Sequence, residues 1–233
     1  MEDRPLRGTL FGVSVGPGDP ELMTLQAVRL LKRCPVIAVP QTGNGGTVAL
    51  DIASQAADLS GKTLLLLPFL MTRDPQKLDE RHRQLADSLK IPLDAGQDVA
   101  MLSLGDASVY SSFSYMAGLL GPEGYSIEVS AGVTSFCASA AALGVSLTGM
   151  NKPLHIIPAG ADDGQALTLS GTRVLMKAGR ALPQLLARLK ARGLLDRAML
   201  VQNCGLPGER ILKTIPEDFD GNPSYFTTVI VKE

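Results

Sequence analysis

The turn Gly16-Pro17-Gly18 constrains the fold of this chain more than any other part of its sequence. The run 9–15 before the turn is apolar and rich in β-branched residues, which is typical of a buried strand. The pair Asp19-Pro20 after it suits the cap and first position of a helix, and apolar residues then recur at helical spacing. We therefore expect a strand, a bare glycine turn and a helix over 20–33. In α/β proteins, small ligands are held at such strand ends.

Composition indicates a folded chain without a strongly charged partner. The chain has 233 residues, of which 45% are hydrophobic and 19% charged, which suits one large domain or two small ones. Its 22 basic and 23 acidic residues nearly cancel. No whole-molecule charge therefore favours nucleic acid or a membrane surface.

The same reading gives an expected location. The charged start is unlike a signal peptide, and the apolar run 64–67 is too short to cross a bilayer. The three cysteines lack metal-ligand spacing and are expected to be reduced. We therefore expect a cytoplasmic protein that binds no nucleic acid, no membrane and no metal.

Strand and helix signals alternate along the chain, which predicts the α/β class. The second half carries more strands for its helices, and a turn at 205–208 joins two of them, so its sheet is expected to be mixed. We place a first α/β domain with a mainly parallel sheet at 1–136 and a second with a mixed sheet at 137–233. Strands are predicted at 9–15, 35–39, 62–67, 98–104, 125–130, 153–158, 172–177, 197–202 and 224–231, and helices at 20–33, 46–58, 75–89, 111–120, 134–143 and 181–192.

Two further glycine turns follow predicted strands, at Gly105 and at Gly132. Each turn taken singly is as consistent with a purely structural role as with a ligand site. If the three strands are parallel neighbours, however, all three turns lie at the carboxyl edge of one sheet. The dinucleotide and phosphate-loop glycine patterns are both absent from the sequence, and Pro17 removes an amide from the first turn. The turns therefore favour a neutral or cationic ligand over a phosphate.

These motifs resemble the tetrapyrrole (corrin/porphyrin) methylase family. That family carries a GPG-x-P-x-L(L/M)T-x-x-A opening, a GDP-x-x-Y/F loop and a PGxTS turn, which stand here at 16–27, 105–110 and 131–135. Residues 174–177 are similar to the family's strand that ends in a cofactor-contacting methionine, and 202–210 to its late strand–turn segment. The resemblance covers nearly the whole chain. It implies two α/β domains with the active site in the cleft between them.

Within the family, residues 104–115 are most similar to the branch that acts on C20 of precorrin-2 or cobalt-factor II. Ala107 and Ala131 depart from the family pattern, because both stand where prolines are usual. Each change loosens a loop, since proline fixes φ and restricts the unfolded chain. Neither change removes a side chain that does chemistry.

The resemblance implies transfer of a methyl group from S-adenosylmethionine to a ring carbon. The sulfonium is already activated, so the protein's task is to align the reactants and exclude water, without a metal or a covalent nucleophile. Carried over position by position, the family's pattern assigns the cofactor site to Pro17, Leu104, Gly105, Asp106, Val109, Thr134, Ser135, Met176 and Cys204.

Asp106 and Tyr110 are the candidates for a direct role in the reaction. Asp106 is expected to hold the cationic end of the cofactor, with orientation of the substrate as the alternative. Tyr110 either hydrogen-bonds the cofactor or macrocycle, or packs as a core aromatic residue. No general base is assigned, because solvent or the substrate's carboxylates can receive the proton. Lys177 and Arg180, just past a predicted strand end, are candidates for binding the carboxylates of the substrate.

Two other kinds of function stay open at this point. One is methylation at another ring position, of another tetrapyrrole, or in a diphthine-synthase-like reaction on a protein. The other is a nucleotide-binding module without catalysis. Members of the family are typically homodimers, and the sequence itself shows no interface.

Overall fold

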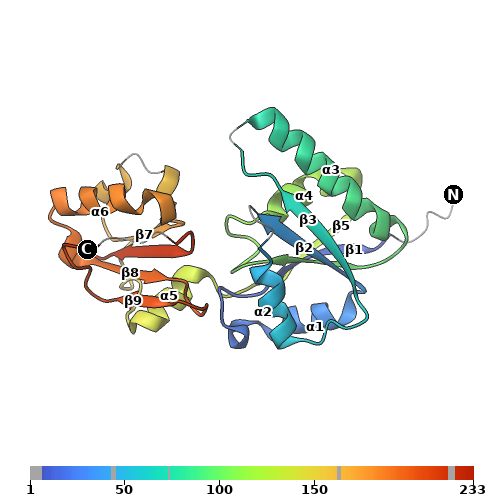
Figure 1. Ribbon diagram of the computed structural model, residues 1–233, viewed down its shortest axis with the longest axis horizontal. Helices are drawn as coiled ribbons and strands as arrows, with labels where there is room; N and C mark the ends of the chain where they lie inside the picture. Colours follow the sequence, from blue (N-terminus) through green and yellow to red (C-terminus); the bar gives the residue numbers. More distant parts are fainter. Residues whose placement is uncertain (1–6, 43–45, 73, 162–163, 220–223) are drawn as a thin grey trace. The chain divides into compact units, whose positions relative to one another are not determined.

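The chain forms two compact units, residues 1–134 and 135–233. The computed structural model describes residues 7–42, 46–72, 74–161, 164–219 and 224–233 (Figure 1). Each unit contains one five-stranded sheet. The domain boundary expected after residue 136 lies two residues beyond this division.

The first unit is built on a parallel sheet with the strand order β3-β2-β4-β1-β5. Helices α1 and α2 cover one face of the sheet and α3 and α4 the other (Figure 1). Its strands are β1 (Thr9–Ser14), β2 (Val36–Thr42), β3 (Thr63–Phe69), β4 (Val99–Ser103) and β5 (Ser126–Val129). Its helices are α1 (Leu25–Arg33), α2 (Val48–Ala56), α3 (Pro75–Asp94) and α4 (Phe113–Leu120).

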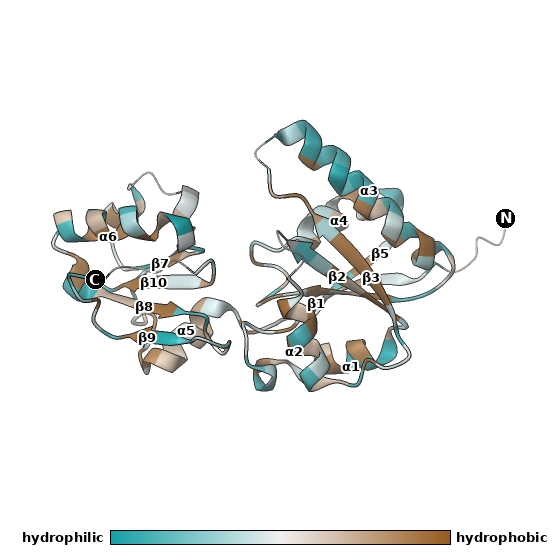
Figure 2. Ribbon diagram, in the orientation of Figure 1, coloured by the Kyte–Doolittle hydropathy of each residue, from teal (hydrophilic) through white to brown (hydrophobic). Residues whose placement is uncertain are grey.

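The centre of this sheet is mostly apolar, as both faces are covered by helices, and its buried serines Ser14 and Ser103 stand at the ends of β1 and β4. All five residues of β4 are buried, and Met101 packs in one core with Phe113 and Met116 of α4. The edge strand β3 differs, because Leu64 and Leu66 stay about half exposed at 46% and 49%. Figure 2 shows β3 brown along its length while α3 is mostly teal, so the helix turns a polar face outward.

The register places the ends of β1, β4 and β5 side by side. Gly12 of β1 pairs with Met101 of β4 on one side and with Val129 of β5 on the other, and both pairs are parallel. The expectation that the strands before the three glycine turns are parallel neighbours is therefore confirmed. All three turns leave the same edge of the sheet.

Two predicted helices differ from those observed. The helix predicted at 20–33 is a 3-10 turn capped by Asp19, followed by α1, because Met23 is extended and Thr24 caps the α-helix through the amide of Ala27. The helix predicted to end at residue 89 continues to Asp94 through Pro92. Proline cannot donate to the carbonyl four residues earlier, but burial of Leu93 on the same apolar face as Leu89 offsets that loss.

The second unit carries the mixed sheet that was expected, in the order β6-β7-β10-β8-β9. β10 is antiparallel to both β7 and β8, whereas β6 and β7 are parallel. Its elements are α5 (Ser135–Leu143), β6 (Leu154–Pro158), β7 (Thr172–Met176), α6 (Leu182–Ala191), β8 (Ala198–Gln202), β9 (Arg210–Leu212) and β10 (Thr227–Val231). Short 3-10 turns lie at Pro20–Leu22, Gly121–Glu123, Ala159–Ala161, Ala166–Thr168, Gly179–Ala181 and Leu195–Arg197.

Two strands of this unit differ from prediction. β9 was not predicted, because it is only three residues long and none of them is buried, so it has no alternating pattern to read. β10 begins at Thr227 rather than at 224, because Ser224 and the residues after it form a turn closed by the Thr227 hydroxyl on the Ser224 carbonyl. Among the described residues, none of the helices has both the length and the apolar character needed to cross a bilayer.

Candidate functional site

The first and second glycine turns are bonded directly to each other. The amide of Gly105 donates to the carbonyl of Gly16 at 2.7 Å, and the amide of Gly16 donates back at 3.2 Å. Both glycines have a φ of 75°, which side chains rarely allow. A Cβ on Gly16 would also lie 3.3 Å from the carbonyl oxygen of Leu22. Glycine is therefore required on both sides of this contact.

Asp106 ties the second turn to the third. Its Oδ2 accepts the amide of Gly132 at 2.7 Å, and its Oδ1 accepts the amide and hydroxyl of Ser108. Burial raises the pKa of Asp106, but the hydrogen bonds from Ser108 and Gly132 outweigh it and leave the pKa below its usual value. The carboxylate is therefore ionised at neutral pH, and its hydrogen bonds give it a structural role in the turns, which the sequence did not predict.

The other first-unit candidates surround these turns. Pro17 is buried next to Gly16, while Leu104 and Val109 are partly buried beside Gly105. Tyr110 is 47% exposed, so it does not pack as a core aromatic residue. Its φ of 48° is unusual for a tyrosine, and such strain is concentrated at functional sites. Thr134 is the last residue of this unit.

Two of the second-unit candidates, Met176 and Cys204, lie at one edge of the mixed sheet. Met176 ends β7 and Cys204 follows β8, and these two strands flank β10. The amide of Ala178 donates to the carbonyl of Thr227 at 3.0 Å, and that of Asn203 donates to the carbonyl of Phe226 at 2.9 Å. The residues after both strands are thus bonded to the start of β10. Ser135, the remaining cofactor candidate, begins α5.

Two residues at this edge are held in the left-handed region without being glycine. Lys177 has a φ of 54° and Asn203 a φ of 51°. The ammonium of Lys177 lies 6.0 Å from the ring centre of Tyr225, within the range of a cation–π contact. Arg180 is exposed in the 3-10 turn that follows. The two predicted substrate-binding cations therefore lie past the end of β7, as expected.

The thiol of Cys204 is not activated. Burial and the nearby Glu209 raise its pKa to about 11, so it stays protonated at neutral pH. Among the described residues, no group of three or more His, Cys, Asp and Glu side chains is placed to hold a metal ion. The chemistry offered by the described candidates is thus that of backbone groups, one carboxylate, hydroxyls and cations.

Several residues of the site escaped prediction. Ser14 and Ser130 are fully buried among the first-unit turns, and Asn203 and Tyr225 shape the edge of the second unit. The signal for Ser14 is a serine in the last position of an otherwise apolar strand. A left-handed asparagine after a strand has no comparable signal, because Asn also serves in ordinary turns.

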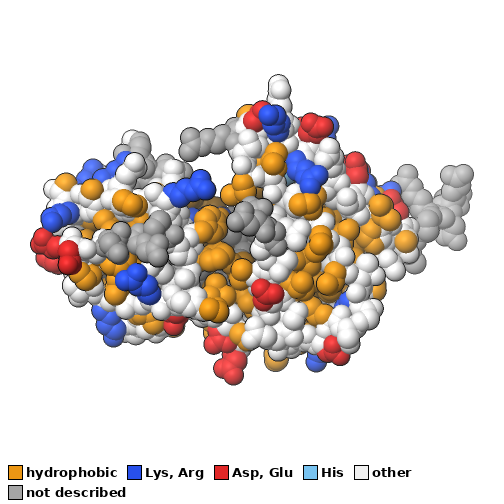
Figure 3. Space-filling view, viewed as in Figure 1, with side chains coloured by type: hydrophobic (Ala, Val, Ile, Leu, Met, Phe, Trp, Pro, Cys, Tyr) orange, Lys and Arg blue, Asp and Glu red, His pale blue; other side chains and the backbone are white. Residues whose placement is uncertain are grey.

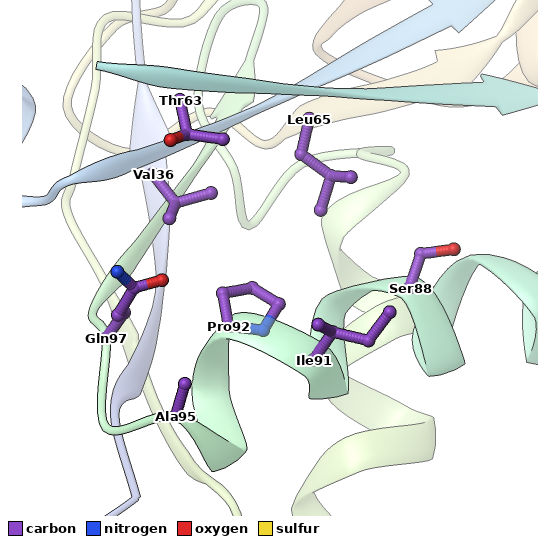
Figure 4. Close-up of a pocket in the computed structure, with 8 residues that line it drawn as sticks. All are labelled: Val36, Thr63, Leu65, Ser88, Ile91, Pro92, Ala95 and Gln97. Carbon is purple, nitrogen blue, oxygen red and sulfur yellow. The ribbon is translucent and has the colours of Figure 1, made fainter. Parts of the chain in front are cut away.

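A cavity of about 260 Å³ in the first unit lies away from these turns. Figure 4 shows it between α3 and the sheet, with Ile91 and Pro92 facing Val36 and Leu65. Val36 and Thr63 are the first residues of β2 and β3, so the cavity is at the amino edge of the sheet, opposite the glycine turns. Its lining is mostly apolar and contributes no charged group.

Comparison with known proteins fits this arrangement. The model of the Tetrapyrrole (Corrin/Porphyrin) Methylases matches residues 9–218. A cobalt-precorrin-2 C(20)-methyltransferase of Salmonella typhimurium is 31% identical over 98% of both chains. A precorrin-2 C(20)-methyltransferase of a Sinorhizobium species is also 31% identical, over 96% of this chain and 95% of its own.

A solved structure extends the likeness to three dimensions. The uroporphyrin-III C-methyltransferase of Thermus thermophilus, in complex with S-adenosylhomocysteine, superposes with a TM-score of 0.71 at 25% identity. The match covers 97% of this chain and 98% of the other. Joined glycine turns, a mixed second sheet and matches over nearly the full length agree: the chain belongs to the tetrapyrrole methylase family.

Proposed function

We propose that this protein transfers a methyl group from S-adenosylmethionine to C20 of precorrin-2 or cobalt-factor II in the synthesis of cobalamin. The observation that carries the proposal is the joining of three glycine turns at one sheet edge in a chain whose full-length relatives bear C(20)-methyltransferase names. The relatives with and without cobalt in their names are equally similar, so both substrates belong in the test.

The proposed cofactor site has an uncharged thiol and an ionised carboxylate. Its residues are Pro17, Leu104, Gly105, Asp106, Val109, Thr134, Ser135, Met176 and Cys204. A bound S-adenosylmethionine supplies a methyl group on a positive sulfur. Asp106 is ionised and so suits a positive ligand, and the protonated Cys204 does not compete for the methyl group as a thiolate would.

The residues of the chain act by holding and orienting the reactants. The methyl carbon forms its new bond with an electron pair of the ring carbon, while the sulfur keeps the pair of the bond that breaks. The ring carbon then loses a proton to solvent or to a carboxylate of the substrate. Alignment and exclusion of water are sufficient to promote such a step.

Lys177 and Arg180 are proposed to bind carboxylates of the macrocycle. The left-handed backbone at Lys177 directs a charged side chain from the point where β7 ends, and Tyr225 lies beside its ammonium. Tyr110, exposed and strained at the edge of the first unit, is proposed to hydrogen-bond the cofactor or the macrocycle.

The direct test is incubation with methyl-labelled S-adenosylmethionine and either precorrin-2 or cobalt-factor II, followed by location of the label by NMR. Label at C20 of at least one substrate is expected. Label at another ring carbon would instead support a methylase of a different position, and transfer only to a protein would support the diphthine-synthase-like reaction.

A calorimetric titration with S-adenosylhomocysteine tests the enzyme class itself. Saturable binding with one site per chain is expected. Absence of binding would leave only a module without methyl transfer, and the catalytic proposal would fall.

We also propose a homodimer that works in the cytoplasm. Hydrophobic side chains gather on the first unit over β3 (Figure 3), and Leu64, Leu66, Leu70 and Met71 are 43–69% exposed there. Such a patch on an edge strand suits contact with a second copy. All three cysteines are free, as in a reducing compartment. Analytical ultracentrifugation should give a mass in solution of twice the chain mass. Leu66→Glu should lower that mass to the mass of one chain.

A further inference from the structure

One buried hydroxyl contacts the loops on both sides of the first glycine turn. Ser14 ends β1, two residues before Gly16, and is fully buried. Its Oγ donates to the carbonyl of Ser130 at 2.6 Å and accepts the amide of Ala107 at 2.9 Å. Its own amide donates to the Oγ of Ser130 at 3.1 Å. The side chain thus bonds the second turn to the residues that lead into the third.

The third turn also packs directly on this side chain. A Cβ added to Gly132 would lie 2.3 Å from the Cβ of Ser14 and 2.7 Å from the carbonyl oxygen of Gly105. These distances leave no room for any side chain at Gly132. The position of Ser14 therefore sets how closely the second and third turns approach the first.

The bond to Ala107 matters because of where that residue stands. The amide of Val109 donates to the carbonyl of Asp106 at 3.1 Å, so Ala107 is the second residue of a β-turn. Proline is favoured at that position and fixes φ there, and it is the residue usual in the family. Alanine leaves φ free and adds a backbone N–H. Because Ala107 is only 1% exposed, this N–H needs a hydrogen-bond partner within the protein. Ser14 is that partner.

We propose that Ser14 is a positioning residue for the cofactor, and that its bond to the Ala107 amide fixes the second turn in place of the missing proline. The inference rests on the proposed function, since it assigns Ser14 to the support of the same site. Ser14 acts through the loops and does not contact the reacting atoms.

The test is a double-mutant cycle between Ser14→Ala and Ala107→Pro, with affinity for S-adenosylhomocysteine measured by calorimetry. Ser14→Ala alone should weaken binding about tenfold and raise the KM for S-adenosylmethionine, with kcat within about twofold of the wild type. In the Ala107→Pro background the same change should cost at least threefold less, because proline supplies the restraint and has no N–H to satisfy. Equal penalties in the two backgrounds would overturn the proposal.

Two controls keep the result decisive. Thr172→Val removes another buried hydroxyl, at the start of β7, and should leave the affinity unchanged. Amide exchange at Ala107 should be slow in the wild type and at least tenfold faster in Ser14→Ala, which tests the bond even if Ala107→Pro does not fold. If the wild type itself fails to bind S-adenosylhomocysteine, the proposed function is wrong. If the wild type and Ser14→Ala bind equally, only the role of Ser14 is wrong.

Discussion

The two sheet edges that carry the candidate residues are built differently at the points where their strands end. In the first unit the tight positions are glycines, and backbone groups of Gly16 and Gly105 bond directly to each other. In the second unit Lys177 and Asn203, which directly follow β7 and β8, have a positive φ despite their side chains. Among the described residues of the first unit, Tyr110 alone does so without being glycine, and it lies further along its loop. Such strain costs about 1–3 kcal/mol per residue. The first edge therefore offers a close-packed backbone wall at its strand ends, with a strained side chain only further out at Tyr110, while the second accepts strain in the residues that directly follow its strands.

The largest effect is expected from adding a side chain at Gly132, which tests whether the turns of the first unit are as closely packed as the structure shows. Gly132→Ala should lower the free energy of unfolding of the first unit by about 3 kcal/mol and abolish binding of S-adenosylhomocysteine, because the new Cβ overlaps Ser14. Urea unfolding and calorimetry measure the two effects.

Gly118→Ala is the matched control for that variant. Gly118 lies in α4, where nothing is within 4 Å of an added Cβ. It should be neutral or stabilising by up to about 1 kcal/mol, because alanine favours helix. Similar losses from both variants would show that tight packing is not specific to the turns.

In the second unit the equivalent test is at Asn203. Its amide Nδ2 donates to the carbonyl of Gly208 at 3.2 Å, and its Oδ1 accepts the hydroxyl of Ser224 at 2.5 Å. Asn203→Ala loses both bonds and keeps the strain, so unfolding should become easier by about 2 kcal/mol. Asn203→Gly loses the same bonds but relieves the backbone, and should recover about 1 kcal/mol of that loss. A lower denaturant midpoint for Asn203→Gly than for Asn203→Ala would contradict a strained backbone at this position.

The tie between the turns of the first unit also predicts a pH dependence. The pKa of Asp106 is lowered from its usual value of 3.8 in the folded protein, so the ionised form stabilises the loops. That contribution, about 1 kcal/mol after screening by solvent, should be constant above about pH 5 and lost as the pH falls through the lowered pKa. Asp106→Asn should be less stable than the wild type at pH 7, with the difference closing in acid. A difference that grows in acid would reverse the sign and refute the assignment.

The smallest change in stability is expected at Lys177, where the effects of a substitution on stability and on substrate binding have opposite signs. Lys177→Gly relieves about 1 kcal/mol of strain and loses about 0.5 kcal/mol of cation–π contact with Tyr225, so the protein should gain slight stability. The KM for the macrocycle should nevertheless rise, because a cation is lost. Lys177→Ala should show the same rise in KM without the gain in stability, which thermal melting can resolve.

The sequence was sufficient for the parts of the fold that follow from local pattern. Runs such as 9–15 and 98–104 are apolar and bounded by glycine, so the strands before the three turns and their parallel pairing could be expected. β9 could not be predicted, because none of its residues is buried. The start of β10 could not be predicted either, because the turn at Ser224 delays it to Thr227. Helix 20–33 was misread since Asp19 and Thr24 are both good caps, and only the extended Met23 decides between them.

The candidate site likewise has parts that local sequence pattern predicts and parts that it does not. The positions of the glycine turns and of the cations after β7 could be predicted from the sequence, because chain order alone places them at strand ends. The supporting contacts were not: Ser14 meets Ala107 across 93 positions, and Asn203 meets Ser224 across 21. Such bonds depend on the folded register, which no local pattern encodes. Strain at Lys177 and Asn203 is likewise a property of the tertiary structure.

The most direct measurement of the central claim is amide hydrogen exchange with and without S-adenosylhomocysteine. Binding should slow exchange in segments 14–18, 104–110 and 130–134 of the first unit, and in residue 135 and segments 176–178 and 203–205 of the second. The segment 88–97, which lines the cavity at the opposite edge of the first sheet, should not change. Protection confined to that cavity, with the glycine turns unaffected, would contradict the account.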